Sequence, residues 1–343
     1  MPKKIRIAIN GFGRIGRTTF KAALARPDIM RQIEIVAVND LMEPAILAHL
    51  LAYDSVFRRT DAKIRATKTH LIVNGQKILV TAEKEPAALP WKQLDVDVAL
   101  ECTGRFTTRE LASGHVTAGA KHVIVSAPAK ETPTYLLGVN VNAGAKRQKV
   151  INNASCTTNC VGPVTAVIES RFGIRKAALT TIHSVTAEQN LVDGPPPGGK
   201  KGDLRRARSG LVNMIPTTTG AAVAVTDVLP RLKGKFDGMA VRVPTLDVSL
   251  SDFTFLLKKK TTVEEVNAAF VKAAAGPHMK GILGVSDLPL VSSDFIGSTY
   301  SAVVDLPYTK VIDGDLLKVL AWYDNEWGYS NRLIEMAVLV GKK

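Results

Sequence analysis

The segment between residues 5 and 40 constrains the fold more than any other part of the chain. An apolar, β-rich run, IRIAIN, passes directly into GFGRIG, which fits G-x-G-x-x-G with Gly11, Gly13 and Gly16. A helix-like stretch follows, and a second apolar run, IEIVAV, leads to Asp40. Glycines at this spacing let the backbone approach a pyrophosphate at a helix N-terminus. This order of elements predicts a dinucleotide-binding βαβ unit.

Asp40 bears on which dinucleotide the unit binds. A carboxylate after the second strand accepts a hydrogen bond from a ribose hydroxyl but repels a 2′-phosphate. The sequence therefore favours NAD over NADP. The alternative is that Asp40 caps the helix expected in LMEPAILAHLLAY.

Further strand-like runs predict that the sheet continues. They are VDVALECTG (96–104), HVIVSAP (122–128) and KVINNAS (149–155), and they alternate with helical stretches. This alternation predicts an α/β fold with a doubly wound parallel sheet. Ligands bind beyond the carboxyl ends of such strands, where the polar ends of these runs should lie.

The stretch NNASCTTNC (152–160) holds two of the three cysteines. A helix is expected after Cys156, whose thiolate would be stabilised by the helix N-terminus, while Cys160 should face the interior. An odd, sparse cysteine count does not suit a disulfide framework. A nucleophilic Cys156 is favoured, with an inert structural cysteine as the alternative. A metal site is the least favoured reading because no further ligands stand at the right spacing.

His183 is the candidate base, because it ends a strand-like run, KAALTTIH. An imidazole within reach of a thiol raises the thiolate fraction and can relay a proton. A histidine at a strand end is more often structural, and its pairing with Cys156 stays open at this stage.

The formal net charge of +14 permits nucleic-acid binding, steering of small anions, or simply a solvated basic surface. The length suggests about two domains. Neither a signal peptide nor a membrane-spanning run is evident, and we expect a cytoplasmic protein without membrane association.

The motifs also occur in a recognisable order. They are GFGRIG, VND, ECTGRF, VSAP, ASCTTNC, TTIHSVTAEQ, DLRRAR, IPTTTGAA, RVPT and AWYDNEWGYS. In this order the chain resembles phosphorylating glyceraldehyde-3-phosphate dehydrogenases from residue 4 to about residue 340.

The resemblance implies a Rossmann-type NAD-binding domain over residues 1–155, completed by a C-terminal helix at about 326–343. An α+β catalytic domain with a mixed sheet would span residues 156–325. The family is usually a homotetramer and acts in glycolysis. It uses NAD, no metal, a small phosphorylated aldehyde and inorganic phosphate, and nucleic acid is not expected as a primary partner.

The resemblance also assigns roles to residues. Cys156 matches the nucleophile, which forms a hemithioacetal and then a thioester, and His183 matches the base. The cofactor contacts would be Gly11, Gly13, Arg14, Ile15, Gly16, Asp40, Lys84, Ser126 and Asn325. Thr186 and Arg242 match the substrate-phosphate site. The inorganic-phosphate site would comprise Ser155, Thr157, Thr219 and Gly220, with Arg206 nearby.

Three features depart from the family pattern: the segment YDSVFRRTDAK (53–63), Glu188, and a long Pro-, Gly- and Lys-rich stretch at 190–208. In the family this last loop reaches a neighbouring subunit's cofactor. The alternatives at this stage are an erythrose-4-phosphate dehydrogenase, an NADP-preferring isoform, and a basic nucleic-acid-binding protein.

Overall fold

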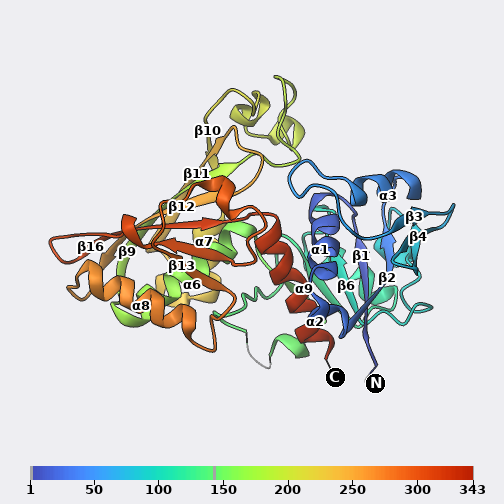
Figure 1. The fold of residues 1–343 in the computed structure, drawn as a ribbon, viewed down its shortest axis with the longest axis horizontal. Helices are drawn as coiled ribbons and strands as arrows, with labels where there is room; N and C mark the ends of the chain where they lie inside the picture. Colours follow the sequence, from blue (N-terminus) through green and yellow to red (C-terminus); the bar gives the residue numbers. More distant parts are fainter. Residues whose placement is uncertain (1–2, 142–143, 343) are drawn as a thin grey trace. The chain divides into compact units, whose positions relative to one another are not determined.

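The computed structural model describes residues 3–141 and 144–342 (Figure 1). The chain divides into two compact units. The first comprises Met1–Tyr135, Val141–Ser155 and Ser330–Lys343, and the second comprises Leu136–Asn140 and Cys156–Tyr329. Each unit is built on its own eight-stranded sheet. No helix in the described ranges is both long enough and apolar enough to cross a membrane.

The sheet of the first unit has the strand order β3-β4-β5-β2-β1-β6-β7-β8. Its six strands from β5 to β8 along this order are parallel, and β3 and β4 extend one edge in antiparallel fashion. The strands are β1 (Ile5–Asn10), β2 (Ile33–Asn39), β3 (Ile64–Ala66), β4 (His70–Val73), β5 (Gln76–Thr81), β6 (Val98–Glu101), β7 (His122–Val125) and β8 (Val150–Asn152).

Helices connect most of these parallel strands, as a doubly wound α/β sheet requires. They are α1 (Arg14–Leu24), α2 (Pro27–Met30), α3 (Pro44–Ala52), α4 (Arg109–Ala112) and α5 (Gly114–Thr117), with single turns η1 (Pro86–Ala88) and η2 (Ala145–Arg147). The central strands β1, β2 and β6 are almost wholly buried, because both faces of the sheet are covered. The predicted parallel strands are all present, although three of them are shorter than expected. The antiparallel edge was not predicted.

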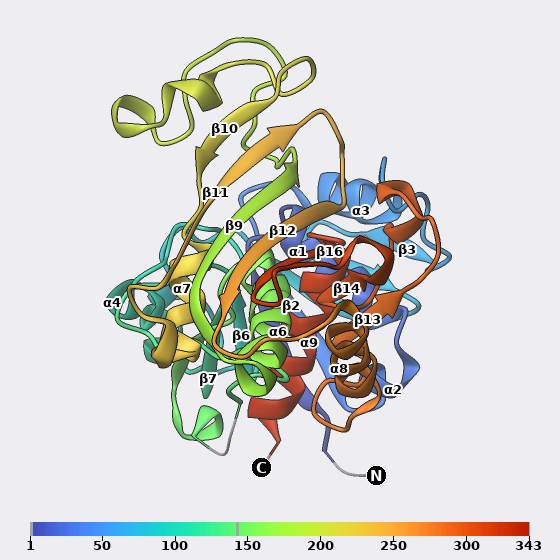
Figure 2. The same ribbon diagram turned by 90° about the vertical axis from the view of Figure 1, so that its left-hand side faces the viewer.

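The second unit contains a mixed sheet with the order β10-β11-β9-β12-β16-β14-β13, and β15 pairs with β16 at its side. The strands are β9 (Ile174–Ser184), β10 (Ile215–Thr218), β11 (Phe236–Val243), β12 (Ser249–Leu257), β13 (Leu283–Ser286), β14 (Ala302–Asp305), β15 (Lys310–Ile312) and β16 (Leu316–Tyr323). Figure 2 shows the long strands β9, β11 and β12 lying side by side. The mixed sheet confirms the fold class expected for the second part of the chain.

Three helices pack on one face of this mixed sheet: α6 (Cys156–Arg171), α7 (Ala221–Val228) and α8 (Val263–Ala275). Strands β12 and β16 alternate buried and partly exposed residues, so that Phe253, Phe255 and Val319 share one core with α6. The final helix, α9 (Trp327–Gly341), begins in this unit and continues into the first.

The segment between β9 and β10 projects beyond the ends of the long strands (Figure 2). It contains two short turns, η3 (Gly199–Lys201) and η4 (Leu204–Ala207). The remaining short turns of the unit are η5 (Pro230–Leu232), η6 (Ser292–Phe295) and η7 (Leu306–Tyr308).

Candidate active site

Cys156 is the first residue of α6, as the sequence predicted. The chain leaves β8, passes Ala154 with a φ of +53°, and turns directly into the helix. This position brings the free amide groups and the positive end of the helix dipole close to the thiol. Cys160, one turn later, is fully buried, and its Sγ lies 3.6 Å from the Oγ atom of Ser251. The expectation that Cys160 faces the interior is confirmed.

His183 lies on β9 and is 4% exposed. Its Nε2 atom is 3.5 Å from the sulfur of Cys156, so the structure brings together the two residues whose pairing the sequence left open. Its Nδ1 atom is 2.7 Å from the carbonyl oxygen of Ser184. A carbonyl can only accept and a guanidinium can only donate, so the Ser184 contact at 2.7 Å favours a proton on Nδ1 and the Arg242 contact at 2.9 Å opposes it. With the proton on Nδ1, Nε2 presents its lone pair to the thiol.

Arg242 lies directly beside His183, because β11 pairs in parallel with β9 and places the two residues in register. Its Nη1 donates to the Ser184 carbonyl at 2.9 Å and to the Thr186 hydroxyl at 3.4 Å, and it lies 2.9 Å from His183 Nδ1. Its buried Nε atom has no hydrogen-bond partner. A buried guanidinium with unused donor capacity is suited to binding an anion.

The electrostatics of the cluster keep both reactive groups neutral. Burial raises the pKa of the Cys156 thiol, and the charge of Arg242 opposes that rise. Burial and, next, the positive charge of Arg242 beside the ring lower the pKa of His183 to about 3. At pH 7 the imidazole is therefore an unprotonated base facing a thiol.

Tyr323 is a member of this cluster to which the sequence reading gave no role. Its hydroxyl lies 2.9 Å from that of Thr157 and 2.8 Å from that of Thr181. Its ring meets the His183 ring edge to face, with centroids 6.0 Å apart. The residue occurred within the motif AWYDNEWGYS, but that motif gave no indication that its side chain turns toward α6.

Besides α6 with Thr157 and β11 with Arg242, three segments of the second unit carry candidate phosphate ligands. Thr186 follows β9, and Arg206 belongs to the short turn η4. Thr219 and Gly220 precede α7, where the Thr219 hydroxyl accepts a hydrogen bond from the Ala221 amide. Thr219 therefore also acts as a local turn residue, as the sequence allowed. Ser155, the residue before Cys156, belongs to the first unit and is partly exposed.

Glu188 pairs with one of these candidate ligands. Its Oε1 atom is 3.1 Å from Nη2 of Arg206, and the Nε atom of Arg206 is buried without a partner. The carboxylate of Glu188 also attracts the charge of Arg242. A negatively charged side chain of the protein thus lies near both arginines.

Asn325 is 4% exposed and follows β16. Its Oδ1 atom accepts hydrogen bonds from the hydroxyl groups of Ser184, at 2.9 Å, and Ser249, at 2.8 Å. These two bonds fix the orientation of the amide and leave the Nδ2 hydrogens as its donors.

In the first unit, the glycine loop between β1 and α1 fits a pyrophosphate. A Cβ atom on Gly11 would lie 2.7 Å from the Thr103 backbone, and one on Gly16 would lie 2.2 Å from the Gly11 carbonyl. A Cβ atom on Gly13 would meet nothing within 4 Å. Gly11 and Gly16 are therefore required for packing, whereas Gly13 leaves open space at the start of the helix, as a bound pyrophosphate needs.

Asp40 follows β2 at the same edge of the sheet. Its Oδ2 atom accepts a hydrogen bond from the Phe12 amide at 2.8 Å, and its Oδ1 atom accepts one from the Met42 amide at 3.1 Å. The alternative that Asp40 caps the following helix is wrong, because Glu43 occupies the cap position of α3. Asp40 instead ties the glycine loop to the end of β2.

The other expected cofactor residues of this unit belong to the same edge or to α1. Arg14 forms an ion pair with buried Asp54 at 2.9 Å, and its guanidinium lies over the Phe57 ring. Ile15 is partly buried on α1, Ser126 directly follows β7, and Lys84 is exposed beyond the end of β5. Because β5, β2, β1, β6 and β7 are parallel, their carboxyl ends share one edge.

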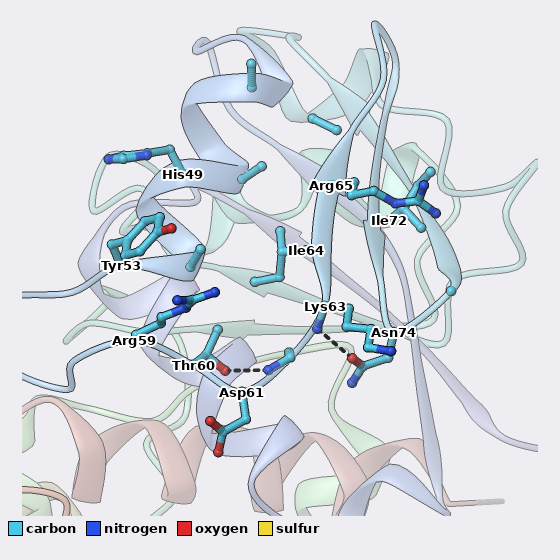
Figure 3. A pocket seen from close by; sticks show the side chains of 16 residues that line it. His49, Tyr53, Arg59, Thr60, Asp61, Lys63, Ile64, Arg65, Ile72 and Asn74 are labelled. Carbon is cyan, nitrogen blue, oxygen red and sulfur yellow. Dashed lines mark hydrogen bonds between the residues drawn. The ribbon is translucent and has the colours of Figure 1, made fainter.

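The unusual segment 53–63 lines a separate cavity of about 1160 Å³ in the first unit. Figure 3 shows this cavity between α3 and the β3–β4 hairpin, with Tyr53, Arg59, Lys63 and Arg65 around it. It contains none of the residues expected to bind the cofactor. Within the described ranges, no group of three or more His, Cys, Asp or Glu side chains could hold a metal ion.

Comparisons with known proteins agree with this geometry. Residues 5–109 match the family model described as glyceraldehyde 3-phosphate dehydrogenase, NAD binding domain, and residues 155–325 match its C-terminal domain. The chain is 52% identical to the glyceraldehyde-3-phosphate dehydrogenase of Geobacillus stearothermophilus over 99% of both chains. It is 50% identical to the Mycobacterium avium enzyme of that name, over 98% of this chain and 99% of the relative.

These full-length similarities, together with the open glycine loop and the paired Cys156 and His183, show that the chain belongs to the glyceraldehyde-3-phosphate dehydrogenase family of NAD-dependent oxidoreductases.

Proposed function

We propose that the chain oxidises glyceraldehyde 3-phosphate to 1,3-bisphosphoglycerate, using NAD and inorganic phosphate, as a step of glycolysis. The observation that carries this proposal is the thiol of Cys156 at the start of α6, 3.5 Å from an unprotonated Nε2 atom of His183. The relatives named for this activity match along nearly their whole length. Because these relatives are named glyceraldehyde-3-phosphate dehydrogenases, neither an erythrose-4-phosphate dehydrogenase nor a nucleic-acid-binding protein is favoured.

The reaction begins when His183 Nε2 accepts the thiol proton as the sulfur of Cys156 adds to the aldehyde carbon. Nε2 then returns that proton to the former carbonyl oxygen, which gives a hemithioacetal with a hydroxyl group. Nε2 next takes the proton of its hydroxyl as the carbon loses a hydride, which gives a thioester. Inorganic phosphate then attacks the thioester carbon and displaces the Cys156 thiolate, and an acyl phosphate is released. The thioester retains the free energy of oxidation for this last transfer.

The glycine loop, Arg14, Ile15, Asp40, Lys84 and Ser126 would hold NAD, and the Nδ2 group of Asn325 would hold its nicotinamide carboxamide. The open space at Gly13 supports this assignment. NAD supplies the acceptor for the hydride. The Asp40 carboxylate favours a ribose hydroxyl over a 2′-phosphate, because a phosphate would bring a second negative charge beside it.

Two anion sites would flank the nucleophile. Thr186 and Arg242 would bind the phosphate of the substrate, and their contact with the His183 segment supports this role. Ser155, Thr157, Thr219 and Gly220 would bind inorganic phosphate, with Arg206 nearby. Binding energy from the substrate's phosphate then orients the aldehyde at the reacting sulfur.

We infer that the chain acts as a homotetramer in the cytoplasm. The projecting segment between β9 and β10 carries large apolar side chains that are between 69% and 78% exposed: Leu191, Val192, Leu204, Val212 and Met214. Exposed apolar side chains in such number support contact with another copy of the chain. The three free cysteines suit a reducing compartment.

The test is NADH formation from glyceraldehyde 3-phosphate and NAD, with phosphate, with arsenate and with neither. Multiple turnover should require one of the two anions. Arg242→Leu should lower kcat/KM for glyceraldehyde 3-phosphate far more than for unphosphorylated glyceraldehyde. Steady NADH production at an undiminished rate without either anion would contradict the phosphorolytic reaction, because water would then be the acceptor.

A further inference from the structure

A row of buried polar side chains lies along the carboxyl edge of the parallel sheet in the first unit. It consists of the last residues of four neighbouring strands: Thr81 of β5, Asn39 of β2, Asn10 of β1 and Glu101 of β6. Asn10, Asn39 and Glu101 are at most 5% exposed. The row adjoins the glycine loop in the chain, because Gly11 directly follows Asn10. The proposed reaction and cofactor contacts use none of these four residues.

The direction of the hydrogen bonds in this row is fixed at one end by the backbone of Glu83. The Glu83 amide donates to Oδ1 of Asn39 at 2.9 Å, and Nδ2 of Asn39 donates to the Glu83 carbonyl at 2.8 Å. Because an amide N–H only donates and a carbonyl only accepts, the Asn39 side chain has one possible orientation. Its Nδ2 also donates to Oδ1 of Asn10 at 2.7 Å. Asn10 therefore turns its own Nδ2 group toward Glu101, where it lies 2.5 Å from Oε2.

The other end of the network is fixed by Trp91, which is buried together with His115. The indole nitrogen of Trp91 lies 2.9 Å from Nδ1 of His115. Since an indole only donates, Nδ1 accepts and the ring proton of His115 lies on Nε2. Nε2 then donates to Oε2 of Glu101 at 2.9 Å. The other oxygen of Glu101, Oε1, accepts hydrogen bonds from the amide of Thr103, at 2.8 Å, and from its hydroxyl.

Glu101 thus meets donors on both of its oxygens. Three of these donors cannot be turned into acceptors: Nδ2 of Asn10, Nε2 of His115 and the amide of Thr103. An ionised carboxylate accepts at both oxygens and satisfies all of them, whereas a glutamine side chain would place its own NH2 group against a donor. A buried donor without an acceptor costs free energy, so the row specifies a carboxylate at position 101.

Glu101 is also connected to the closest backbone approach of the glycine loop. Gly11 has a φ of +87°, and a Cβ atom there would lie 2.7 Å from the amide nitrogen of Thr103. The backbones of Gly11 and Thr103 are therefore in direct contact. Glu101 holds Thr103 through its amide and hydroxyl, and it holds Asn10, the residue before Gly11. One carboxylate thus fixes both sides of this contact.

We infer that Glu101, as an ionised carboxylate, is a positioning residue that sets the place of Gly11 against Thr103 and so shapes the glycine loop for the pyrophosphate of NAD. This inference rests on the proposed function, in which that loop holds NAD. The four hydrogen bonds of Glu101 all go to protein groups, so this residue acts through the loop and not on the cofactor itself. A backbone shift of a fraction of an ångström is enough to weaken the hydrogen bonds that a bound pyrophosphate accepts from loop amides.

The experiment uses the full-length protein and two variants of the row. Glu101→Gln keeps the size of the side chain but turns an NH2 group toward fixed donors. The double variant Asn10→Asp, Glu101→Gln restores the order of donors and acceptors, because the carboxylate moves one place along the row and the glutamine amide donates to it. Nε2 of His115, which lies 3.4 Å from Nδ2 of Asn10, can then donate to the same carboxylate.

Asp97→Asn is the matched control. Asp97 is also a buried carboxylate, and it directly precedes β6, so it lies at the amino end of the strand whose carboxyl end is Glu101. It accepts hydrogen bonds from the Arg6 amide, at 2.8 Å, and from Lys121, at 2.7 Å. Its replacement should lower stability without disturbing the glycine loop.

Dissociation constants for NAD and for ADP-ribose, which lacks the nicotinamide, are measured by isothermal titration calorimetry. The midpoint of thermal unfolding reports stability, and the rate of Cys156 alkylation by iodoacetamide, without cofactor, reports the nucleophile in the other unit. Glu101→Gln should bind both ligands about five- to twentyfold more weakly, because both contain the pyrophosphate. Its alkylation rate should equal that of the wild type. The double variant should bind both ligands within about threefold of the wild type, and Asp97→Asn within about twofold.

Wild-type affinity in Glu101→Gln would overturn the inference. So would an equal loss in Asp97→Asn at a similar loss of stability, because affinity would then follow stability alone. A loss of affinity for NAD but not for ADP-ribose would place the effect at the nicotinamide and would also overturn it. If Glu101→Gln does not fold, the double variant decides: it should fold and bind NAD, and failure in either respect contradicts the assigned order of donors and acceptors. Absence of turnover with glyceraldehyde 3-phosphate would count only against the proposed reaction, because none of these measurements needs the substrate.

Discussion

The Nε2 atom of His183 lies 3.5 Å from the sulfur of Cys156, on the side of the ring opposite the nitrogen that Ser184 binds. The Ser184 carbonyl favours the tautomer with the proton on Nδ1, and the Arg242 charge disfavours a second proton on the ring. The imidazole is thereby kept as a base, because the thiol can lose its proton only to a group that is not already protonated. The geometry thus places the thiol and the base for proton transfer, whereas the raised pKa of Cys156 and the lowered pKa of His183 favour the neutral pair before substrate binds.

We expect Cys156→Ser to reduce dehydrogenase activity on the order of a thousandfold or more, because an alkoxide forms far less readily than a thiolate. The measurement is NADH formation at saturating substrate. Cys160→Ser is the matched control, since Cys160 is buried, with its pKa raised to about 12, and it faces Ser251. That control should retain a substantial fraction of activity. A reversed order of the two effects would show that the nucleophile is Cys160.

His183→Asn should lower kcat by about 10²- to 10⁴-fold, the usual range for loss of a general base. It should also slow alkylation of Cys156 by iodoacetamide near neutral pH, because the thiol then has no proton acceptor at hydrogen-bonding distance. Alkylation is followed by mass spectrometry of the peptide that contains Cys156. An alkylation rate equal to that of the wild type would show that the 3.5 Å contact does not activate the thiol.

Asp40→Gly should weaken NAD use and improve NADP use, by removing both a ribose acceptor and a repulsive charge. Loss of a hydrogen bond to a charged group should weaken the binding free energy of NAD by about 1.5–3 kcal/mol. Since Asp40 also binds the Phe12 amide, the glycine variant would loosen the loop as well. Asp40→Asn separates the two effects, because its amide oxygen can still accept from Phe12 while the charge is lost. The measurement is kcat/KM for each dinucleotide, and a wild-type preference for NADP would refute the role of the charge.

The sequence carried enough information to predict the local features of the fold and of the site. Gly11 and Gly16 stand where any side chain would clash, and Cys156 stands where a strand-like run gives way to a helical one. Both features depend on residues that are close in the chain. The periodicity of apolar residues and the positions of turn-forming residues indicate such local structure. The antiparallel edge formed by β3 and β4 was missed, because its strands have only three and four residues.

Long-range pairings could not be predicted in the same way. Arg242 meets His183 only because β11 lies in parallel register with β9, 59 residues earlier in the chain. Tyr323 reaches Thr157 across 166 residues, after β16 has joined the mixed sheet. The order of motifs located most of these residues, but their contacts depend on the strand order of the sheet, which no local pattern encodes.

The last prediction concerns Glu188, whose carboxylate pairs with Arg206 at 3.1 Å and also attracts Arg242. A carboxylate in this position competes with a phosphate for the same guanidinium groups, so Glu188→Gln should lower KM for glyceraldehyde 3-phosphate. Glu188 is 49% exposed, and the effect should therefore be about two- to fivefold, as expected for a partly solvated ion pair. It should shrink as the salt concentration rises. Glu264→Gln, an exposed glutamate at the start of α8, controls for the change in net charge. Unphosphorylated glyceraldehyde should react equally with both variants, because it offers no phosphate for Glu188 to oppose. A higher KM for the phosphorylated substrate would show instead that Glu188 holds Arg206 in the orientation that binds phosphate.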